Sequence, residues 1–397
     1  MNYTVGGTTQ VVLQPNVDFL TMRYGGNGTY SFTAPVKVVL NAGCNDSDWA
    51  VVLPGEVGIA YYQSPDSGIP DCKAYDKAMA GAKHGAGAIL IANDVTRTSL
   101  LASRIRGDGY YEGDYIVQVP VLAITHSLAD AMKNQAAVTV SISTQTEIII
   151  ANTQNLYCTT PGGNANDLVV IGAHLDSVPA GPGINDNGSG SATLLEIVLQ
   201  FFKLKFKPSA KIQFSWWGAE ELGLLGSRAF VNSSKMTNSP VPFSSIKMGV
   251  NFDMLASPNG IPEYHDITVP GNPTFPETAL RGSAAISQAF KSAFDNANVN
   301  TMATAMTGGS DYYPFALEGI PAGGLATGAG GIKTDAQRAQ FGGLANAAMD
   351  PCYHQPCDTV ANIGQDILGK MSQAAARAIA TFALQNDINA FLARGGD

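Results

Sequence analysis

Apolar positions along the chain form two successive patterns, and the change lies near residue 146. Before that point, short apolar runs between turn residues predict strands at 36–40, 57–62, 88–92 and 119–124, and a helix at 73–85. After it, strands are predicted at 147–153, 168–173, 211–217 and 246–252, and a helix at 189–206. Alternating strands and helices indicate an α/β fold with a mixed, largely parallel central sheet and helices on both faces. The first part is predicted to be a small, β-rich α+β domain.

The helix predicted at 189–206 has one apolar face. That face contains Leu194, Ile197, Val198, Phe201 and Phe202. We therefore expect these five side chains to pack against the sheet.

Residues suited to metal binding follow the ends of the predicted strands in the second part. They are His174, Asp186, Glu220, Glu221 and Asp253, and His354 lies farther along the chain. The carboxyl ends of strands in open α/β sheets carry functional residues, so these side chains are expected to converge. Adjacent glutamates at the start of a helix are often only a solvated first turn. Two tryptophans precede Glu220, however, and a carboxylate beside an apolar wall needs a cation.

These side chains combine imidazole and carboxylate groups, a combination that suits zinc. Two histidines and three acids can hold a pair of ions if one carboxylate bridges them, and Asp186 is the natural bridge. Two metals about 3.5–4 Å apart can hold a hydroxide nucleophile, polarise a carbonyl and stabilise the oxyanion that forms. The set therefore predicts a metal-dependent amide hydrolase.

Composition and charge exclude several classes of protein. Hydrophobic residues make up 45% of the 397 residues and charged residues 14%, which favours compact domains over disordered tails. A net charge of −9 without a Lys/Arg cluster argues against a nucleic-acid partner. A membrane partner is not expected, since no apolar run approaches the roughly 20 residues that span a bilayer. Sequons at Asn2, Asn27, Asn45 and Asn232 favour a secreted glycoprotein, whereas the one at Asn187 is expected to stay unmodified beside the metal ligands.

Five cysteines allow two disulfides with one thiol left over, which would suit an oxidising compartment. Cys44 and Cys72 lie in the first part of the chain, and Cys352 and Cys357 flank His354. Two alternatives stay open: five reduced, buried cysteines, or a zinc knuckle formed by Cys352, His354 and Cys357.

Seven segments, in this order, resemble the co-catalytic zinc aminopeptidases of metallopeptidase family twenty-eight, particularly the branch of secreted leucine aminopeptidases and vacuolar aminopeptidase Y. The segments are residues 174–177, 183–190, 217–227, 251–254, 310–315, 319–325 and 352–358. The resemblance extends over most of residues 146–390 and implies a zinc exopeptidase fold. It also implies a metal-dependent aminopeptidase that binds peptides with a free N-terminus and releases single residues, expected to be apolar ones such as Leu.

Carried over to this chain, the family pattern implies two Zn²⁺ per chain and a division of roles. The ligands would be His174 and Asp253 for one ion, Glu221 and His354 for the other, and Asp186 as the bridge. Glu220 would be the general base and acid. Asp176 would accept the second ring N–H of His174 and fix its tautomer, and Tyr353 would hydrogen-bond the oxyanion. Acids such as Glu220 and Asp253 would hold the α-amine of the substrate.

Residues 28–145 resemble a protease-associated domain inserted near the start of such peptidases. This resemblance implies that the catalytic domain is discontinuous, formed by residues 1–27 and 146–397, and that Cys44 pairs with Cys72. The insertion would either narrow access to the metal site or act as a passive spacer.

Two positions depart from the family pattern. Many relatives have Arg where this chain has Gly309, and Glu where it has Gly330. We expect these two residues to form an ion pair in relatives, so that their joint loss leaves a roomier or less polar substrate-binding wall here.

The same scaffold supports other functions: carboxypeptidase, dipeptidase, glutaminyl cyclase, or a binding module without activity. The complete ligand set argues against the cyclases, which use one zinc, and against an inactive module, which would have lost ligands. A carboxypeptidase would need a cation for the substrate carboxylate, and the sequence marks none of Arg281, Lys333 and Arg338 for that role. We expect a monomer that is secreted or lies in a vacuolar or lysosome-like compartment.

Overall fold

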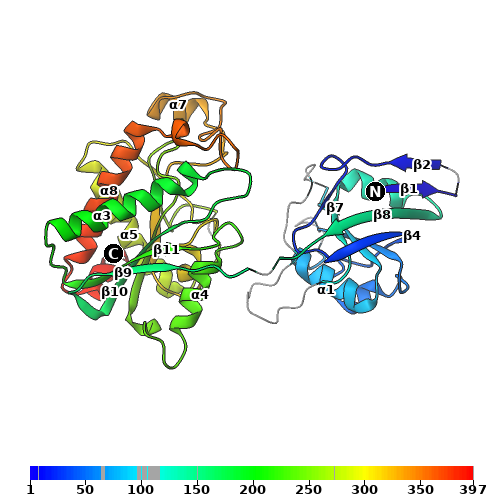
Figure 1. The fold of residues 1–397 in the computed structure, drawn as a ribbon, viewed down its shortest axis with the longest axis horizontal. Coiled ribbons are helices and arrows are strands. Elements are labelled where there is room, and N and C mark those ends of the chain that lie inside the picture. Colours follow the sequence, from blue (N-terminus) through cyan, green and yellow to red (C-terminus); the bar gives the residue numbers. More distant parts are fainter. Residues whose placement is uncertain are drawn as a thin grey trace. The chain divides into compact units, whose positions relative to one another are not determined.

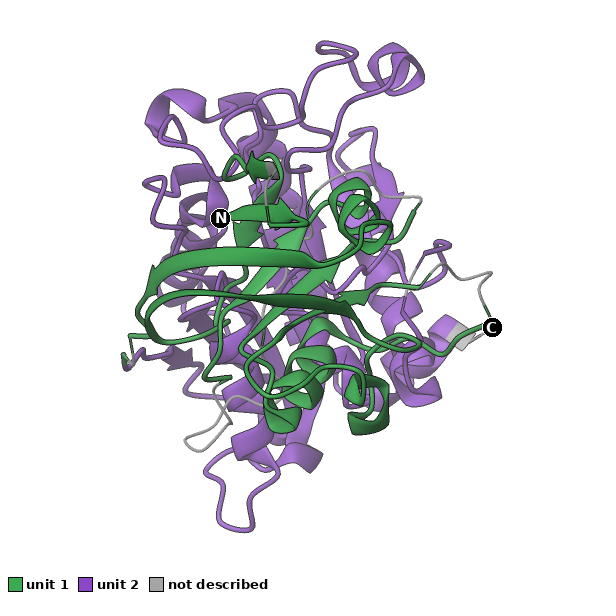
Figure 2. Ribbon diagram, turned by 90° about the vertical axis from the view of Figure 1, so that its right-hand side faces the viewer, with its two compact units in different colours: residues 1–151 green, residues 152–397 purple. Residues whose placement is uncertain are grey.

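The computed structural model describes residues 1–7, 9–63, 68–95, 100, 105, 117–149, 151–271 and 273–396. The chain divides into two compact units, unit 1 from Met1 to Ala151 and unit 2 from Asn152 to Asp397. Figure 2 colours the two units separately. No helix in the described ranges is both long and apolar enough to cross a membrane.

Unit 1 is built on a sheet that has eight strands in its described residues, in the order β2-β1-β8-β4-β5-β6-β7-β3 (Figure 1). The strands are β1 (Asn2–Val5), β2 (Thr9–Val12), β3 (Phe19–Thr21), β4 (Gly28–Val38), β5 (Val57–Tyr61), β6 (Ala88–Ala92), β7 (Val121–Ile124) and β8 (Val138–Thr146). The helices are α1 (Ala74–His84) and α2 (His126–Lys133), with a short turn η1 (Asp46–Trp49). Strands β4 to β7 run parallel, and the other pairs are antiparallel.

The central strands of unit 1 are buried on both faces. Side chains that alternate along β6 enter two different hydrophobic clusters, Leu90 on one face and Ile89 and Ile91 on the other. A strand covered on both sides reads as an unbroken apolar run, which explains why the sequence pattern located it correctly.

The N-terminal segment lies in unit 1, which differs from the discontinuous catalytic domain expected from the sequence. Strand β1 pairs with β8, and β3 pairs with β7, for example through Phe19 opposite Ile124. Residues 1–27 therefore complete the sheet of unit 1, although Thr8 lies outside the described residues. The boundary between the units falls near residue 151 and not at 146.

Unit 2 contains a sheet that has seven strands in its described residues, in the order β14-β13-β15-β12-β10-β11-β9. The strands are β9 (Leu156–Thr159), β10 (Asn164–His174), β11 (Ala210–Trp217), β12 (Ile246–Phe252), β13 (Glu263–His265), β14 (Met302–Thr304) and β15 (Ala322–Ala326). The helices are α3 (Gly190–Lys203), α4 (Leu225–Ser234), α5 (Glu277–Asp295), α6 (Tyr313–Leu317), α7 (Asp335–Phe341), α8 (Gln365–Ala383) and α9 (Ile388–Ala393). Four of the strand pairs are parallel and two are antiparallel, so the predicted mixed, largely parallel sheet is confirmed.

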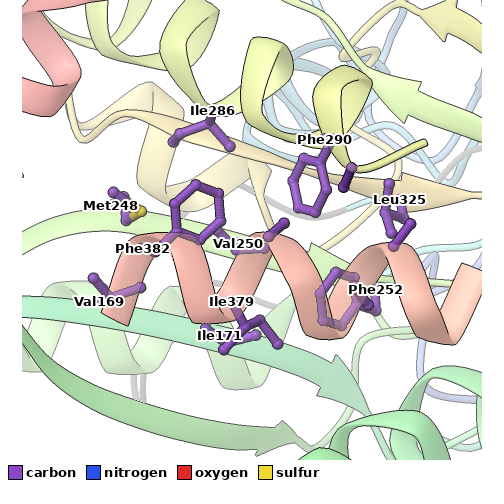
Figure 3. Packing of buried hydrophobic residues seen from close by; sticks show 14 of the residues in the cluster. Val169, Ile171, Met248, Val250, Phe252, Ile286, Phe290, Leu325, Ile379 and Phe382 are labelled. Carbon is purple, nitrogen blue, oxygen red and sulfur yellow. The ribbon is translucent and has the colours of Figure 1, made fainter. Parts of the chain in front are cut away.

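Helices pack on both faces of this sheet. In β10, Val169 and Ile171 join a core with α3, α5, α8 and α9, whereas Leu168 and Val170 join a second core with α4 and α6. Figure 3 shows the first core, in which Phe290 of α5 and Phe382 of α8 lie over the apolar side chains of β10 and β12. Burial on both faces fixes the register of the central strands, because a shift by one residue would exchange their two faces.

The strand predicted at 147–153 does not form. Ile150 lies outside the described residues, and the others in this stretch belong to neither helix nor strand. The strand on this edge is β9, and it pairs antiparallel with β11.

The central parallel strands bring their carboxyl ends to one edge of the sheet. Strand β10 pairs with β11 and β12, and His174 at the end of β10 lies opposite Trp217 at the end of β11. The loops that follow these three strands therefore leave the sheet side by side, as the sequence predicted for the metal-binding residues.

Candidate active site

His174 lies at the centre of a first cluster of metal-binding groups. Its side chain is 1% exposed, and its Nε2 is 3.2 Å from Asp186 Oδ1 and 3.3 Å from Asp253 Oδ1. The last residue of β10, the segment η3 (Ile184–Ser189) and the residue directly after β12 supply these three groups. Their potential ligand atoms all lie within 4.8 Å of one another.

A second cluster shares Asp186 with the first. His354 Nε2 is 3.2 Å from Asp186 Oδ2 and 3.0 Å from Glu221 Oε1. Asp186 thus directs one carboxylate oxygen to each histidine, as a bridging ligand must. The structure brings together the five residues that the family pattern implied as ligands.

The donor set fits metal ions. Glu221 Oε1 is buried and makes no hydrogen bond with the described residues, although it lies 3.0 Å from His354 Nε2. Close approach of a carboxylate and an imidazole without a hydrogen bond is expected where both atoms share an ion. Each cluster combines imidazole with carboxylate, which matches zinc, and the two clusters offer room for two ions.

Electrostatics in the site also favour cations. Burial alone would lower the pKa of His174, but the carboxylates of Asp253 and Asp186 raise it well above its ordinary value. Burial raises the pKa of Glu221 to about 7, with a further contribution from Asp186. Burial and then the neighbouring Asp311 raise the pKa of Glu220 well above its ordinary value. The raised pKa values mean that these groups hold protons, which neutralise part of the negative charge of the carboxylates. Bound cations would neutralise the same charge.

Asp176 positions the glutamate pair. Its two carboxylate oxygens accept the backbone N–H groups of Glu220 and Glu221, at 2.9 and 3.1 Å. The nearest acceptor for His174 Nδ1 is the backbone oxygen of Asp176 at 2.9 Å, and the Asp176 carboxylate is 3.7 Å away. Asp176 therefore meets His174 Nδ1 through its backbone oxygen and not, as the family pattern implied, through its carboxylate, and its side chain holds the loop after β11.

The loop that carries Asp186 is tied to the loop that carries His354. Asp358 accepts the backbone N–H groups of Asn185 and Asp186, at 2.9 and 3.1 Å. Asp350 accepts a hydrogen bond from the Asn185 side chain at 2.6 Å. Sequence reasoning gave neither aspartate a role, although Asp358 lies in the segment 352–358, because a carboxylate that fixes a loop has no spacing signature.

Asn187 is part of the same scaffold. It is 2% exposed, its side-chain nitrogen donates to Phe252, and its side-chain oxygen accepts from Gly190 and Met254. Its amide nitrogen is thus occupied by a hydrogen bond inside the fold. That this sequon stays unmodified remains a prediction.

Two further residues contact the clusters from outside. The Ser310 hydroxyl donates a hydrogen bond to Asp253 Oδ2, and Asn251 donates to the Ser310 oxygen at 2.7 Å. The Tyr353 ring stacks on the His354 ring with centroids 3.8 Å apart. Tyr353 and its phenol therefore lie beside the second cluster.

A cavity of about 250 Å³ opens beside the two clusters. It is lined by Asp186, Glu220, Glu221, Asp253, Met254, Glu263, His265, Thr304, Ala305, Thr307, Gly309, Ser310, Tyr312, Ala326, Gly328, Ala329, Tyr353 and His354. Glu220 belongs to neither metal cluster but lies on the cavity wall. Glu263 and His265 were not singled out from the sequence, because their strand is only three residues long.

Gly309 lies on this cavity wall, and Gly330 lies next to Tyr353. A Cβ at Gly309 would meet nothing nearer than 3.9 Å, and one at Gly330 would lie 3.5 Å from the Tyr353 ring. Both positions have space for a side chain. The roomier substrate-binding wall expected from the sequence stays a prediction, and this free space supports it.

Both predicted disulfides are present, Cys44–Cys72 and Cys352–Cys357. Cys158 on β9 is the remaining thiol and is exposed. The alternatives of five reduced cysteines and of a zinc knuckle are therefore wrong. Asp71 lies near Cys44 and Cys72, but disulfide sulfurs are not thiolate ligands.

Comparisons with known proteins agree with this site. The family model described as Peptidase family M28 matches residues 155–379. Probable leucine aminopeptidase 2 of Aspergillus fumigatus is 35% identical over 371 residues, which cover 92% of this chain and 69% of that protein. Probable lipoprotein aminopeptidase LpqL of Mycobacterium tuberculosis is 36% identical over 351 residues, covering 86% and 65%. The chain thus spans about two thirds of the length of these relatives.

Among solved structures, the aminopeptidase from Aneurinibacillus sp. strain AM-1 is similar with a TM-score of 0.68 and 22% identity, over 98% of this chain and 81% of that chain. This likeness supports the fold. The match of the family model to unit 2, together with the identity to the Aspergillus protein, confirms the resemblance found in the sequence: the chain belongs to Peptidase family M28.

Proposed function

We propose that this chain is a zinc-dependent aminopeptidase that releases single residues from the free N-terminus of peptides. The observation that carries the proposal is the pair of His/carboxylate clusters that share Asp186 at the edge of a cavity. Membership of Peptidase family M28 and the aminopeptidase names of the relatives support a hydrolase of this kind.

Two ions per chain fit the residues. His174 and Asp253 would hold one ion, Glu221 and His354 the other, and Asp186 both. When bound, the ions act as Lewis acids that activate water and polarise the scissile carbonyl. The proposal includes zinc because mixed imidazole and carboxylate donors suit it.

Glu220 is the general base and acid in this proposal. It lies on the cavity wall outside both clusters, and its backbone is fixed by Asp176. Its carboxylate takes a proton from the attacking water and delivers it to the leaving amine. A raised pKa suits both halves of this transfer, because the group must hold the proton before giving it away.

The charges in the cavity indicate which groups of the substrate would bind where. Glu220 and Asp253 would bind the α-ammonium group, and the phenol of Tyr353 would donate a hydrogen bond to the developing oxyanion. Burial raises the pKa of Tyr353, so the phenol keeps its proton. No Lys or Arg is among the cavity-lining residues that the structure describes, which disfavours a carboxypeptidase, since that enzyme needs a cation for the substrate carboxylate.

The remaining parts of the proposal concern partners and location. We propose a monomer that acts on peptides, without a nucleic-acid or membrane partner. Two disulfides support a secreted protein or one in a vacuolar or lysosome-like compartment. Unit 1 would act as a protease-associated domain that narrows access to the metals or serves as a spacer.

The test is hydrolysis of aminoacyl-4-nitroanilides compared with their N-acetyl forms, together with metal analysis. An aminopeptidase cleaves the free forms, ignores the blocked ones and contains two zinc ions per chain. Cleavage of the blocked forms would contradict the exopeptidase assignment. Glu220→Gln serves as the inactive control.

A further inference from the structure

One wall of the cavity carries acceptors that no part of the proposed reaction uses. Glu263 and His265 are two residues apart on β13 and both line the cavity. Tyr264 between them packs into the core of unit 2. Because side chains alternate along a strand, this arrangement places Glu263 and His265 on one face, turned away from that core.

Glu263 is buried on the cavity wall without a partner among the described residues. Its side chain is 6% exposed, and no hydrogen bond or ion pair joins it to another residue in the described part of the chain. Burial raises the pKa of Glu263 to about 7, with no contribution from a neighbouring charge. A buried carboxylate without a cation or a donor costs free energy, so it is expected only where something outside the fold supplies the partner.

His265 adds a second acceptor beside it. It is 8% exposed, and its Nδ1 is buried without a hydrogen-bond partner in the described part of the chain. Burial lowers the pKa of His265 to about 4, so the ring is neutral near pH 7 and its unprotonated nitrogen accepts hydrogen bonds. The described lining contains no Lys or Arg that could satisfy either group.

We propose that Glu263, with His265, forms the end of the cavity that receives the side chain of the N-terminal residue and selects a cationic one, lysine or arginine. A side-chain ammonium or guanidinium supplies the donors and the positive charge that this wall lacks. The volume of about 250 Å³ is several times the roughly 30 Å³ of one water molecule, so a long side chain fits beside the metal clusters.

This substrate class rests on the proposed aminopeptidase function and differs from the apolar residue expected from the family resemblance. Unlike Glu221 and Asp253, Glu263 belongs to neither metal cluster, so its charge is not needed to balance bound ions. Its role is to distinguish substrates by their side chains, and it acts on no reacting bond.

The experiment compares lysine with norleucine, whose side chain lacks only the terminal ammonium. The wild-type protein should cleave lysyl-4-nitroanilide with a kcat/KM at least about 10-fold above that for norleucyl-4-nitroanilide. Glu263→Gln keeps size and should lower this ratio by about 10-fold or more, mainly through a lower kcat/KM for lysyl-4-nitroanilide. A calorimetric unfolding transition like that of the wild type shows that the variant folds. Glu277→Gln, at a carboxylate that is 73% exposed, is the matched control and should leave the ratio unchanged.

A preference for norleucine in the wild type, or a ratio unaffected by Glu263→Gln, would overturn the proposal. Binding of free lysine and norleucine, measured by calorimetry, separates this failure from failure of the proposed function. If the protein cleaves neither substrate but binds lysine more tightly than norleucine, and Glu263→Gln removes that difference, the proposed pocket stands and the proposed aminopeptidase function fails. If the protein cleaves neither substrate and binds lysine no better than norleucine, both proposals fail.

Discussion

Glu220 and Glu221 are neighbours in sequence but have different surroundings, which is the main chemical distinction at the scale of single residues. Glu221 belongs to the cluster with Asp186 and His354, whereas Glu220 faces the cavity outside both clusters. The carboxylate of Asp176 holds both backbones at once. One aspartate therefore fixes the backbone at both glutamates.

This difference predicts opposite effects of two isosteric substitutions. Glu220→Gln should lower kcat about 10²–10⁴-fold, since the proton transfer is lost, and leave two zinc ions bound. Glu221→Gln should weaken binding of one zinc by more than about 10-fold, because a direct ligand matters more than an outer contact. Atomic absorption and kinetics on the same preparations measure both effects. Loss of zinc from the Glu220 variant would argue that Glu220 is a ligand.

The unpaired carboxylate of Glu263 predicts a pH-dependent cost in stability. Its pKa is about 7 in the folded protein and 4.5 in a model peptide, so between these values the folded state binds more protons. The free energy of unfolding therefore falls as pH rises through this range, by about 3 kcal/mol in total. Glu263→Gln should raise Tm by several degrees at pH 8 and by little at pH 5, as measured by calorimetry. An equal gain at both values would show that the carboxylate does not titrate in this way.

At the scale of secondary structure, the sequence predicted best the elements that are buried on both faces. Strands β11 and β12 and the buried end of β10 lie within a residue of the predicted bounds, because continuous apolar runs leave little choice. The three-residue strands β13 and β14 were not predicted, since a run that short has no periodicity to read. The acceptors on β13 were missed for the same reason.

Helix α3 shows where a helical pattern becomes ambiguous. The prediction placed Phe202 on the packed face with Leu194 and Ile197, but Phe202 is 77% exposed. Leu195 and Leu199 are about half exposed on the same helix, at 49% and 54%. Apolar residues thus occur around most of α3, and sequence alone does not tell which side meets the sheet.

The loop closed by Cys352 and Cys357 predicts a local role for a disulfide. Replacing both cysteines with serine should cost about 2 kcal/mol and weaken zinc at the site of His354 and Glu221, since the short loop fixes His354. The Cys44–Cys72 bridge closes a longer loop in unit 1, so replacing these two cysteines should cost more, about 3.5 kcal/mol, with both zinc ions retained. Zinc content after dialysis distinguishes the pairs. Equal zinc loss in both would mean that the Cys352–Cys357 bridge has no special part in the site.

At the scale of the whole molecule, the sequence predicted two domains but assigned the N-terminal segment to the wrong one. The hydrogen bonds of β1 and β3 decide its place, and their partners β7 and β8 lie more than a hundred residues farther along the chain. A pairing at that distance leaves no local pattern. The proposed metal ligands, in contrast, could be singled out because each follows a strong strand signal or lies in a recognisable segment, and the parallel sheet then brings them together.

The two units have separate hydrophobic cores, and all the proposed metal ligands belong to unit 2. Ligands that bind only the folded state raise stability by mass action. Calorimetry of the full chain should therefore show two transitions, of which a chelator lowers only one. The lowered transition should be that of unit 2, and the variant Cys44→Ser/Cys72→Ser identifies the other because it shifts unit 1 alone. Adding zinc back should restore the first transition and the peptidase activity together. Equal shifts of both transitions would show that the units do not unfold independently, and no shift at all would contradict the metal site.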